Sequence, residues 1–373
     1  MALEIQIQKR EMLKPSIPTP NHLCTLNLSL FDQPDPHNYT QVLFHYLPSI
    51  NADLAELGFQ IELLDDLLPW RIVVPLESKD LFPLLGIQVN LFNCGGLVFG
   101  IQISHIIADS FRIATFIKEW ARVSRTGMTT KDCLPSFGHL PSLFPATVVP
   151  LEHHQFSPPT SSDIVSPKIV TRRFLFDALT IAKLKDRINS TSPLTKPTRV
   201  MTIMSLIWKV LGEINAAKHG HTRDSYFVIP INARGKSKIP SLENALGNGC
   251  IAGIASLEAN HRQELHDIVN LIGSTPRDAS LGIAKASIDD ITSMLTRWTF
   301  YLCSRWCRFP WYEADFGWGK PFWVSSASRS GEVIFLMDTK DGDGTEAWVS
   351  LKENDIVEFE RNIPDILSSF CFE

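Results

Sequence analysis

The sequence predicts an α/β protein of two similar domains, each a mixed sheet with helices on its faces. Two strand-and-helix units follow one another, one from about residue 74 and the second from the segment "IVTRRFLFD" at 169–177. Between them, residues 135–168 are rich in Pro and Ser, which is typical of a long surface connection. A chain of 373 residues, 44% of them hydrophobic, can form a large core or two adjoining ones.

The first unit is predicted from alternation and turn residues. The segment 3–20 suits a short strand ended by a Pro-rich turn, and "HLCTLNLSLFD" at 22–32 alternates as a half-buried strand should. Residues 87–104 form two alternating runs joined by "NCGG", whose glycines supply the positive φ of a tight hairpin. Apolar residues at helical spacing follow over 110–125. His105 therefore ends a strand, and Asp109 begins a helix.

The second unit continues with a predicted helix at 198–218 and a strand at 225–234. The Gly-rich "ALGNGCIAG" at 245–253 lacks the spacing of a phosphate loop or a dinucleotide-binding turn. "DTKDGDGTEAW" at 338–348 fails as a calcium loop because Lys340 occupies a ligand position, so we expect a hairpin turn there.

Composition excludes several classes of partner. The net charge of −5 and the scattered Lys and Arg residues argue against a nucleic-acid partner. No apolar stretch reaches the ~18 residues of a membrane span, and the chain start lacks a signal-peptide core, so we expect a cytoplasmic protein without a membrane partner. We also expect a monomer. Seven Cys without C-x-x-C spacing suit reduced thiols. We expect Cys303 and Cys307 on one helix face and no metal site, including at His153 and His154.

The segment "QISHIIADSF" at 102–111 leaves two interpretations open. His105 four positions before Asp109 could be a proton acceptor with its partner, or a strand end followed by a helix cap. Chance alone predicts about 0.6 such pairs in this composition, so the pair by itself decides nothing.

The segment "DFGWG" at 315–319 is far more specific, with a chance expectation of roughly one in ten thousand. Together with the His–Asp pair it resembles the plant BAHD acyltransferases, which take the acyl group from a coenzyme A thioester. The amino-terminal segment, "TRVMTIMSLIWKV" and "INARGKSKIPSLENALGNG" are similar to further segments of that family. The resemblance covers most of the chain.

The resemblance implies two domains of the chloramphenicol acetyltransferase-like type, joined by a long crossover loop, with the active-site channel at their interface. The first domain would comprise residues 1–155 and a returning segment of about 305–332. The second would comprise 166–304 and 333–373.

The resemblance also implies a mechanism. His105 would act as general base on a hydroxyl or amine of a small-molecule acceptor, an apolar plant metabolite such as an alkaloid or terpenoid. Acyl-CoA, preferably acetyl-CoA, would be the co-substrate, with no permanently bound cofactor. Transfer would be direct, since no Gly-x-Ser-x-Gly elbow or marked Cys nucleophile occurs. The residues that contact coenzyme A are not identified.

Other residues receive structural roles. Asp109 is either the partner of His105 in a triad or, as the resemblance favours, a helix cap that pairs with Arg234 and shapes the loop of His105. Asp315 would pair with a cation, and Gly317 and Gly319 would permit a tight loop around Trp318. Asn248 is either a polar group near the tetrahedral intermediate or a turn residue.

The chain departs from the family pattern after "FHYLPS". It passes from Ser49 to "LDDLLPWR" with roughly fifty residues fewer than the family pattern, enough for about three strands. The loss would leave new sheet edges. Two hypotheses follow: a working acyltransferase with an altered acceptor side, or a catalytically inactive truncated relative that at most binds ligands or partners.

Overall fold

The computed structural model describes residues 6–14, 16–21, 24–32, 39–47, 61–70, 83–128, 135–146, 167–192, 196–234, 242–259, 264–282, 299–327, 329 and 331–371. The chain divides into two compact units. Unit 1 comprises Met1–Pro150, Asn232–Cys250 and Phe309–Ala327, and unit 2 comprises Leu151–Ile231, Ile251–Arg308 and Ser328–Glu373. The predicted channel between the domains stays a prediction.

Unit 1 is built on a four-stranded sheet in the order β2-β3-β1-β8. Its strands are β1 (Tyr39–Tyr46), β2 (Leu85–Leu91), β3 (Leu97–Ser104) and β8 (Trp323–Ser325), and their pairs are antiparallel. Every residue of β1 is buried, because β1 lies between β3 and β8. The sheet thus brings the segment that follows "DFGWG" beside the first strand.

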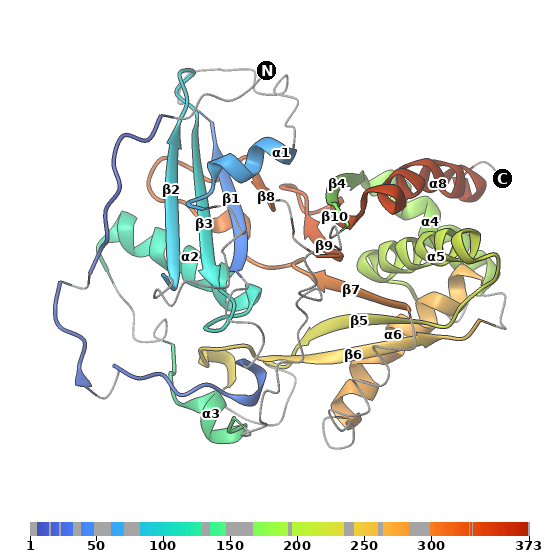
Figure 1. Cartoon of the computed structure of the whole chain (residues 1–373), viewed down its shortest axis with the longest axis horizontal. Coiled ribbons are helices and arrows are strands. Elements are labelled where there is room, and N and C mark those ends of the chain that lie inside the picture. The colour runs from blue at the N-terminus through green and yellow to red at the C-terminus, as the bar shows by residue number, and fades with distance from the viewer. Residues whose placement is uncertain are drawn as a thin grey trace. The chain divides into compact units, whose positions relative to one another are not determined.

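Short helices and one long helix complete unit 1. They are η2 (Leu30–Asp32), α1 (Ile61–Leu64), η4 (Asp65–Leu67), α2 (Ser110–Thr126), α3 (His139–Leu143), η6 (Leu242–Asn244) and η7 (Trp311–Glu313). Figure 1 shows α1 in front of the strands. The 3-10 helix η4, which follows α1, packs closely against β3: a Cβ on Gly100 would lie 2.0 Å from the carbonyl oxygen of Leu67. Only glycine permits this approach of backbone to sheet.

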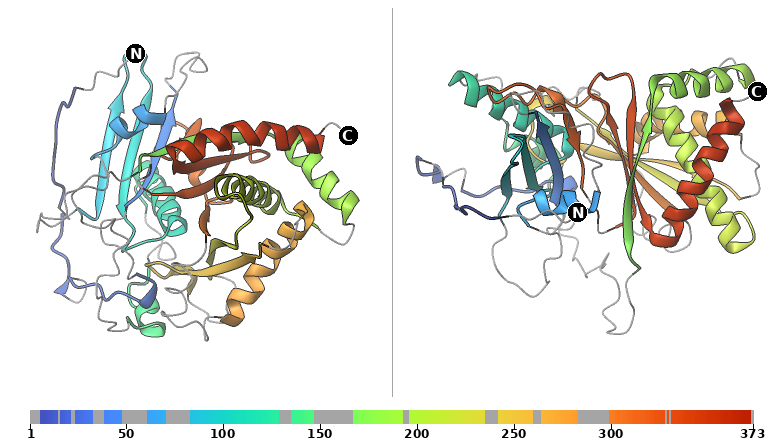
Figure 2. Two further views of the ribbon diagram at one scale, coloured as in Figure 1. Left: turned by 45° about the vertical axis from the view of Figure 1, so that its right-hand side comes forward. Right: turned by 90° about the horizontal axis from the view of Figure 1, so that it is seen from above.

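Unit 2 has a six-stranded mixed sheet in the order β4-β10-β9-β7-β5-β6. The strands are β4 (Ile169–Phe176), β5 (Ser225–Asn232), β6 (Cys250–Leu257), β7 (Thr299–Arg305), β9 (Val333–Asp338) and β10 (Thr345–Lys352). β10 pairs antiparallel with β4 and β9, whereas β7 pairs parallel with β5 and β9. The helices α4 (Ala178–Thr191), α5 (Arg199–His219), α6 (Leu265–Gly282) and α8 (Glu353–Cys371) lie together on one face (Figure 2).

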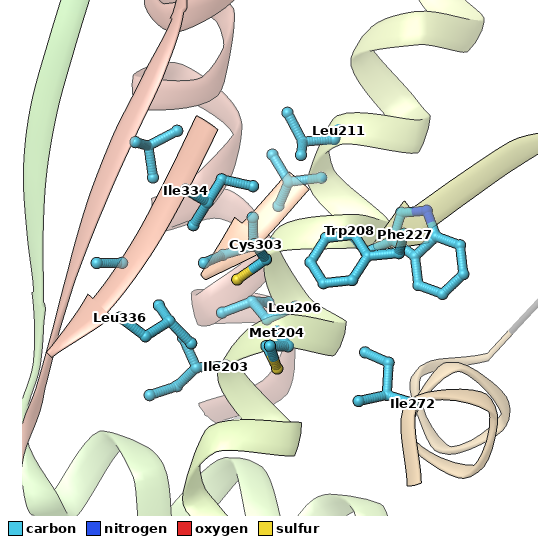
Figure 3. Close-up of a cluster of buried hydrophobic side chains, with 14 of the residues drawn as sticks. Ile203, Met204, Leu206, Trp208, Leu211, Phe227, Ile272, Cys303, Ile334 and Leu336 are labelled. Atoms are coloured by element: carbon cyan, nitrogen blue, oxygen red, sulfur yellow. The ribbon is translucent and has the colours of Figure 1, made fainter. Parts of the chain in front are cut away.

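The core of unit 2 lies between α5 and this sheet. Figure 3 shows Leu206 of α5 facing Cys303 and Ile334 of the strands. The indole of Trp208 stacks on Phe227 with ring centroids 5.1 Å apart, and its Nε1 donates to Ser225 Oγ at 3.0 Å. By length and hydropathy α5 could cross a membrane, although no segment was expected to be apolar enough. Its burial in the core makes it the central helix of unit 2.

Most local predictions are confirmed. The predicted hairpins are β2–β3, with Gly95 at φ 84°, and β9–β10, with Gly342 at φ 76°. The predicted helices at 110–125 and 198–218 are α2 and α5. The α/β class of both units is also confirmed.

Three predictions are wrong within the described residues. Residues 6–14 are irregular, and 24–32 form a turn and η2 where a strand was expected, because the side chain of Asp32 binds the amide of Ser29 and turns the chain. Cys303 lies in β7 and not on a helix, so its spacing from Cys307 has no helical meaning.

The units differ from the predicted domains in one long segment and at both ends of the returning segment. Asn232–Cys250 was placed in the second domain, whereas its contacts place it in unit 1. The segment Phe309–Ala327 also belongs to unit 1. The predicted boundaries at 155 and 166 lie outside the described residues, and so does the segment after Ser49. The predicted division therefore stays a prediction at these points.

Candidate active site

His105 lies in a tight turn between β3 and α2, all within unit 1. The amide of Ile107 donates to the carbonyl of Ser104 at 3.2 Å, and Ala108 forms a bridge with Gly247. His105 is half-buried. The strand end and the helix start thus fix both sides of a three-residue turn that carries the imidazole.

Asp109 caps the helix and also holds a buried ion pair. Its Oδ1 accepts from the amide of Arg112 at 2.9 Å, which makes Asp109 the N-cap of α2. Its Oδ2 accepts from Arg234 Nη1 at 2.5 Å, and both side chains are at most 5% exposed. Asp109 therefore faces the arginine of the "NAR" segment, the arrangement that the resemblance implied.

The segment 247–249 is clamped by this ion pair. Arg234 Nη2 donates to the carbonyl of Gly247 at 2.7 Å, and the amide of Gly249 donates to Asp109 Oδ2 at 2.8 Å. A Cβ on Gly249 would lie 2.6 Å from the guanidinium carbon of Arg234. Gly247 has φ 104°, and a Cβ there would lie 3.0 Å from Asp32. Both glycines are needed because charged groups approach the backbone from two sides.

Asn248 joins this clamp to the turn of His105. Its Nδ2 donates to the carbonyl oxygen of His105 at 2.7 Å and to Asp32 Oδ1 at 2.9 Å, and its backbone amide donates to the same Oδ1 at 2.6 Å. Both amide hydrogens of the side chain are thus engaged. Of the two roles left open for Asn248, the geometry favours the structural one.

No carboxylate holds the imidazole from behind in the described part of unit 1. The Nδ1 of His105 is buried there and has no hydrogen-bond partner. Both oxygens of Asp109 are occupied by Arg112, Arg234 and Gly249. The geometry therefore does not support Asp109 as the carboxylate partner of His105 in a catalytic triad. The backbone of the turn is left to orient the imidazole ring.

Arg112 adds a second cation beside Arg234. It donates to the carbonyl of Glu243, and its guanidinium lies over Phe111 at 5.9 Å. Burial, together with the nearby charge of Arg234, lowers the pKa of Arg112 to about 10. Arg112 stays charged at neutral pH, so two cations stand near the single carboxylate of Asp109.

The "DFGWG" loop is a separate structural feature of unit 1. Asp315 Oδ1 accepts from the amides of Gly317 and Gly319 at 2.9 and 3.1 Å, and Oδ2 pairs with Arg125 at 2.9 Å. These bonds lower the pKa of Asp315, and the hydrogen bond from the Gly317 amide has the largest effect. Gly317 and Gly319 have φ of 117° and 105°, and Trp318 stacks on Phe316 at 5.6 Å. Within the described residues the loop contacts Arg125 and Trp120 of α2 and Phe99 of β3, so it braces this helix and this strand and not the turn of His105.

Among the described residues no group of three or more His, Cys, Asp or Glu side chains could hold a metal ion. His153 and His154 lie outside the described residues.

Asp32 was not among the site residues predicted from the sequence. It lies in "SLFD", where Ser three positions before Asp is the pattern of a side-chain-capped turn. The partner of Asp32 is Asn248, 216 residues away, which no local pattern indicates.

A family model described as the Transferase family matches residues 52–365. The match spans most of the chain, so the chain belongs to this family, the BAHD acyltransferases of plants, as the sequence predicted.

Relatives of the chain are acyltransferases. The acetyl-CoA-benzylalcohol acetyltransferase of Clarkia breweri is 29% identical and covers 96% of this chain and 98% of its own. The limonoid 1-O-acetyltransferase of Citrus sinensis is 30% identical over 96% and 97%. The alignment with the Clarkia enzyme runs over 434 positions, more than the 373 residues here. It does not locate the residues without a counterpart, so the deletion after Ser49 stays a prediction.

Solved structures share the fold. Vinorine synthase has a TM-score of 0.74 at 23% identity and covers 93% of this chain and 95% of its own. TRI101 of F. sporotrichioides, complexed with coenzyme A and T-2, has a TM-score of 0.68 at 17% identity, over 90% and 96%. These likenesses confirm the two-sheet α/β fold class.

Proposed function

We propose that this chain transfers an acyl group, preferably acetyl, from acyl-CoA to a hydroxyl or amine of a plant specialised metabolite, with His105 as general base. The carrying observation is the turn of His105, which the Asp109–Arg234 pair and Asn248 hold from two sides. The acetyl donor is supported by relatives named as acetyltransferases.

The proposed reaction is a direct transfer. The imidazole of His105 takes the proton of the acceptor hydroxyl while its oxygen attacks the thioester carbonyl carbon. The tetrahedral intermediate collapses, the carbon–sulfur bond breaks, and the coenzyme A thiolate takes the proton from the imidazolium. Asp109 and Arg234 do not exchange protons in this scheme; they hold the turn. We also propose that the chain works in the cytoplasm as a monomer without a permanently bound cofactor.

The test is thiol release from acyl-CoA. The full chain is mixed with acetyl-CoA and a panel of alcohols that includes benzyl alcohol, and free coenzyme A and ester are measured together. We expect His105→Ala to lower the turnover about 10²- to 10⁴-fold with an unchanged melting temperature. The exposed His221 offers a matched control, and His221→Ala should retain full turnover.

Three outcomes contradict parts of this proposal. Full turnover of His105→Ala excludes His105 as the base. A preference for benzoyl-CoA or coumaroyl-CoA over acetyl-CoA in titration and turnover overturns the acetyl donor. Binding of acyl-CoA without thiol release with every acceptor supports the inactive relative instead.

A further inference from the structure

Asp32 is a buried carboxylate that binds Asn248, the residue whose side chain donates to the carbonyl of His105. It is 3% exposed. Its Oδ2 accepts from the amide and hydroxyl of Ser29 at 2.8 and 2.6 Å, and its Oδ1 accepts from the amide and side chain of Asn248 at 2.6 and 2.9 Å. All four donors are neutral groups. A buried carboxylate needs hydrogen bonds to its oxygens, and Asp32 has them on both.

The carboxylate determines which way the Asn248 amide points. The two ends of an amide have nearly the same shape, but one end donates and the other accepts. With Asp32 on one side and the carbonyl of His105 on the other, only the NH₂ group can face both oxygens. Without an acceptor at the position of Asp32, the amide could turn over. Its oxygen would then face the carbonyl oxygen of His105, and the two would repel.

The orientation matters because His105 has little else to fix its ring. Its Nδ1 has no hydrogen-bond partner in the described part of the chain, so the backbone of the turn carries the orientation. The carbonyl of His105 is the point at which Asn248 reaches that backbone.

We propose that Asp32 is a positioning residue for His105 and acts through the Asn248 amide. The inference rests on the proposed function of His105 as the base. Asp32 does not touch the reacting atoms in this scheme; it holds the peptide group from which the imidazole projects. A displacement of a catalytic group by about 1 Å can lower a rate about 10²-fold.

The experiment compares Asp32→Asn, Asn248→Ala and the double variant with wild type. Asp32→Asn keeps the size, but its NH₂ group must face either the donors of Ser29 or those of Asn248. Asn248→Ala keeps the backbone bond to Asp32 and serves where the first variant folds poorly. The control is Glu346→Gln in β10, an equally buried carboxylate at 3% exposure with bonds to Arg173 and Trp348.

We expect kcat to fall about 10- to 100-fold in each single variant, with the KM for acetyl-CoA within about threefold of wild type. The double variant should fall no further than the larger single effect, because both changes break one chain of contacts. Glu346→Gln should lower the melting temperature and keep kcat. In ¹³C-labelled histidine spectra, the Cε1–H signal that His105→Ala removes should shift in both single variants and not in the control.

Retention of kcat in Asp32→Asn and Asn248→Ala, with an unmoved His105 signal, overturns the inference. Additive losses in the double variant overturn it as well. The spectra keep this test separate from the proposed function. If His105→Ala stays active, the proposed function fails by itself, whereas a shifted His105 signal in the Asp32 and Asn248 variants still supports the positioning contact.

Discussion

Asp109 serves two neighbours with its two oxygens, and the neighbours differ in kind. Oδ1 caps α2, a bond that an amide side chain could also accept, whereas Oδ2 meets the buried guanidinium of Arg234. A lone buried charge is far less stable than a paired one, so the second contact carries more of the stability. The loss of either partner should therefore weaken the turn that holds His105.

Asp109→Asn should destabilise the protein by about 3 kcal/mol or more and lower turnover with it, because Arg234 keeps a buried charge without its partner. Arg234→Met should have a similar effect, and the double variant should lose less than the sum. Denaturant unfolding and thiol release measure both. Asp177→Asn is the control, since Asp177 caps α4 in the same way but is exposed. Additive losses would contradict a shared ion pair.

At the scale of elements, the segment 247–249, which the Asp109–Arg234 ion pair holds, needs glycine at both ends because there is no room for a side chain. The positions around Asn248 accept Arg234 from one side and Asp32 from the other, so any side chain must displace a charged group. The "DFGWG" loop uses its glycines differently, for positive φ with open space around them. One residue type thus has two physical roles in unit 1.

Gly249→Ala should lower both the melting temperature and turnover, because the new methyl group would lie 2.6 Å from the Arg234 guanidinium carbon. Gly331→Ala is a suitable control, since a Cβ there meets nothing within 4 Å and its φ is ordinary. Differential scanning calorimetry and thiol release check the pair. Equal behaviour of the two variants would mean that Arg234 moves aside without loss.

Local patterns predicted the elements that local forces determine. The β2–β3 hairpin follows from alternation and from Gly95, and the start of α2 follows from the capping side chain of Asp109. The prediction of a strand at 22–32 was wrong because the alternation of apolar and polar residues does not reveal that a side chain, here that of Asp32, binds the nearby backbone. The role of Asn248 was left open because its two acceptors, Asp32 and His105, are distant in sequence.

At the scale of the whole molecule, β2 is the edge strand among the described strands of the unit 1 sheet, and one of its faces is apolar and exposed. The side chains of Leu85, Ile87, Val89 and Leu91 share one face of β2 and are 37%, 36%, 54% and 82% exposed. The strand carries no charged residue, although charges are the usual protection of an edge strand against pairing with another chain. A deletion next to this sheet was expected to leave such an edge.

Val89→Lys combined with Leu91→Lys should reduce self-association at high protein concentration and leave turnover unchanged, since neither residue lies in the site. Light scattering as a function of concentration measures the first effect. The same substitutions at the exposed Leu175 and Leu179 of unit 2 control for the added charge. An equal reduction in both variants would assign the effect to net charge and not to the edge.

The contact between Asp32 and Asn248 also constrains the order of events during synthesis. The two residues are 216 positions apart, so at 5–20 residues per second the ribosome needs about 10 to 40 s between them. During that interval the carboxylate can bind Ser29 but not the partner that links it to His105. The emerging chain must keep this segment hydrated, since burial of the charge before Asn248 arrives would be unfavourable. Under the proposed positioning role of Asp32, the orientation of the His105 ring is therefore set only after residues 245–250 have been synthesised.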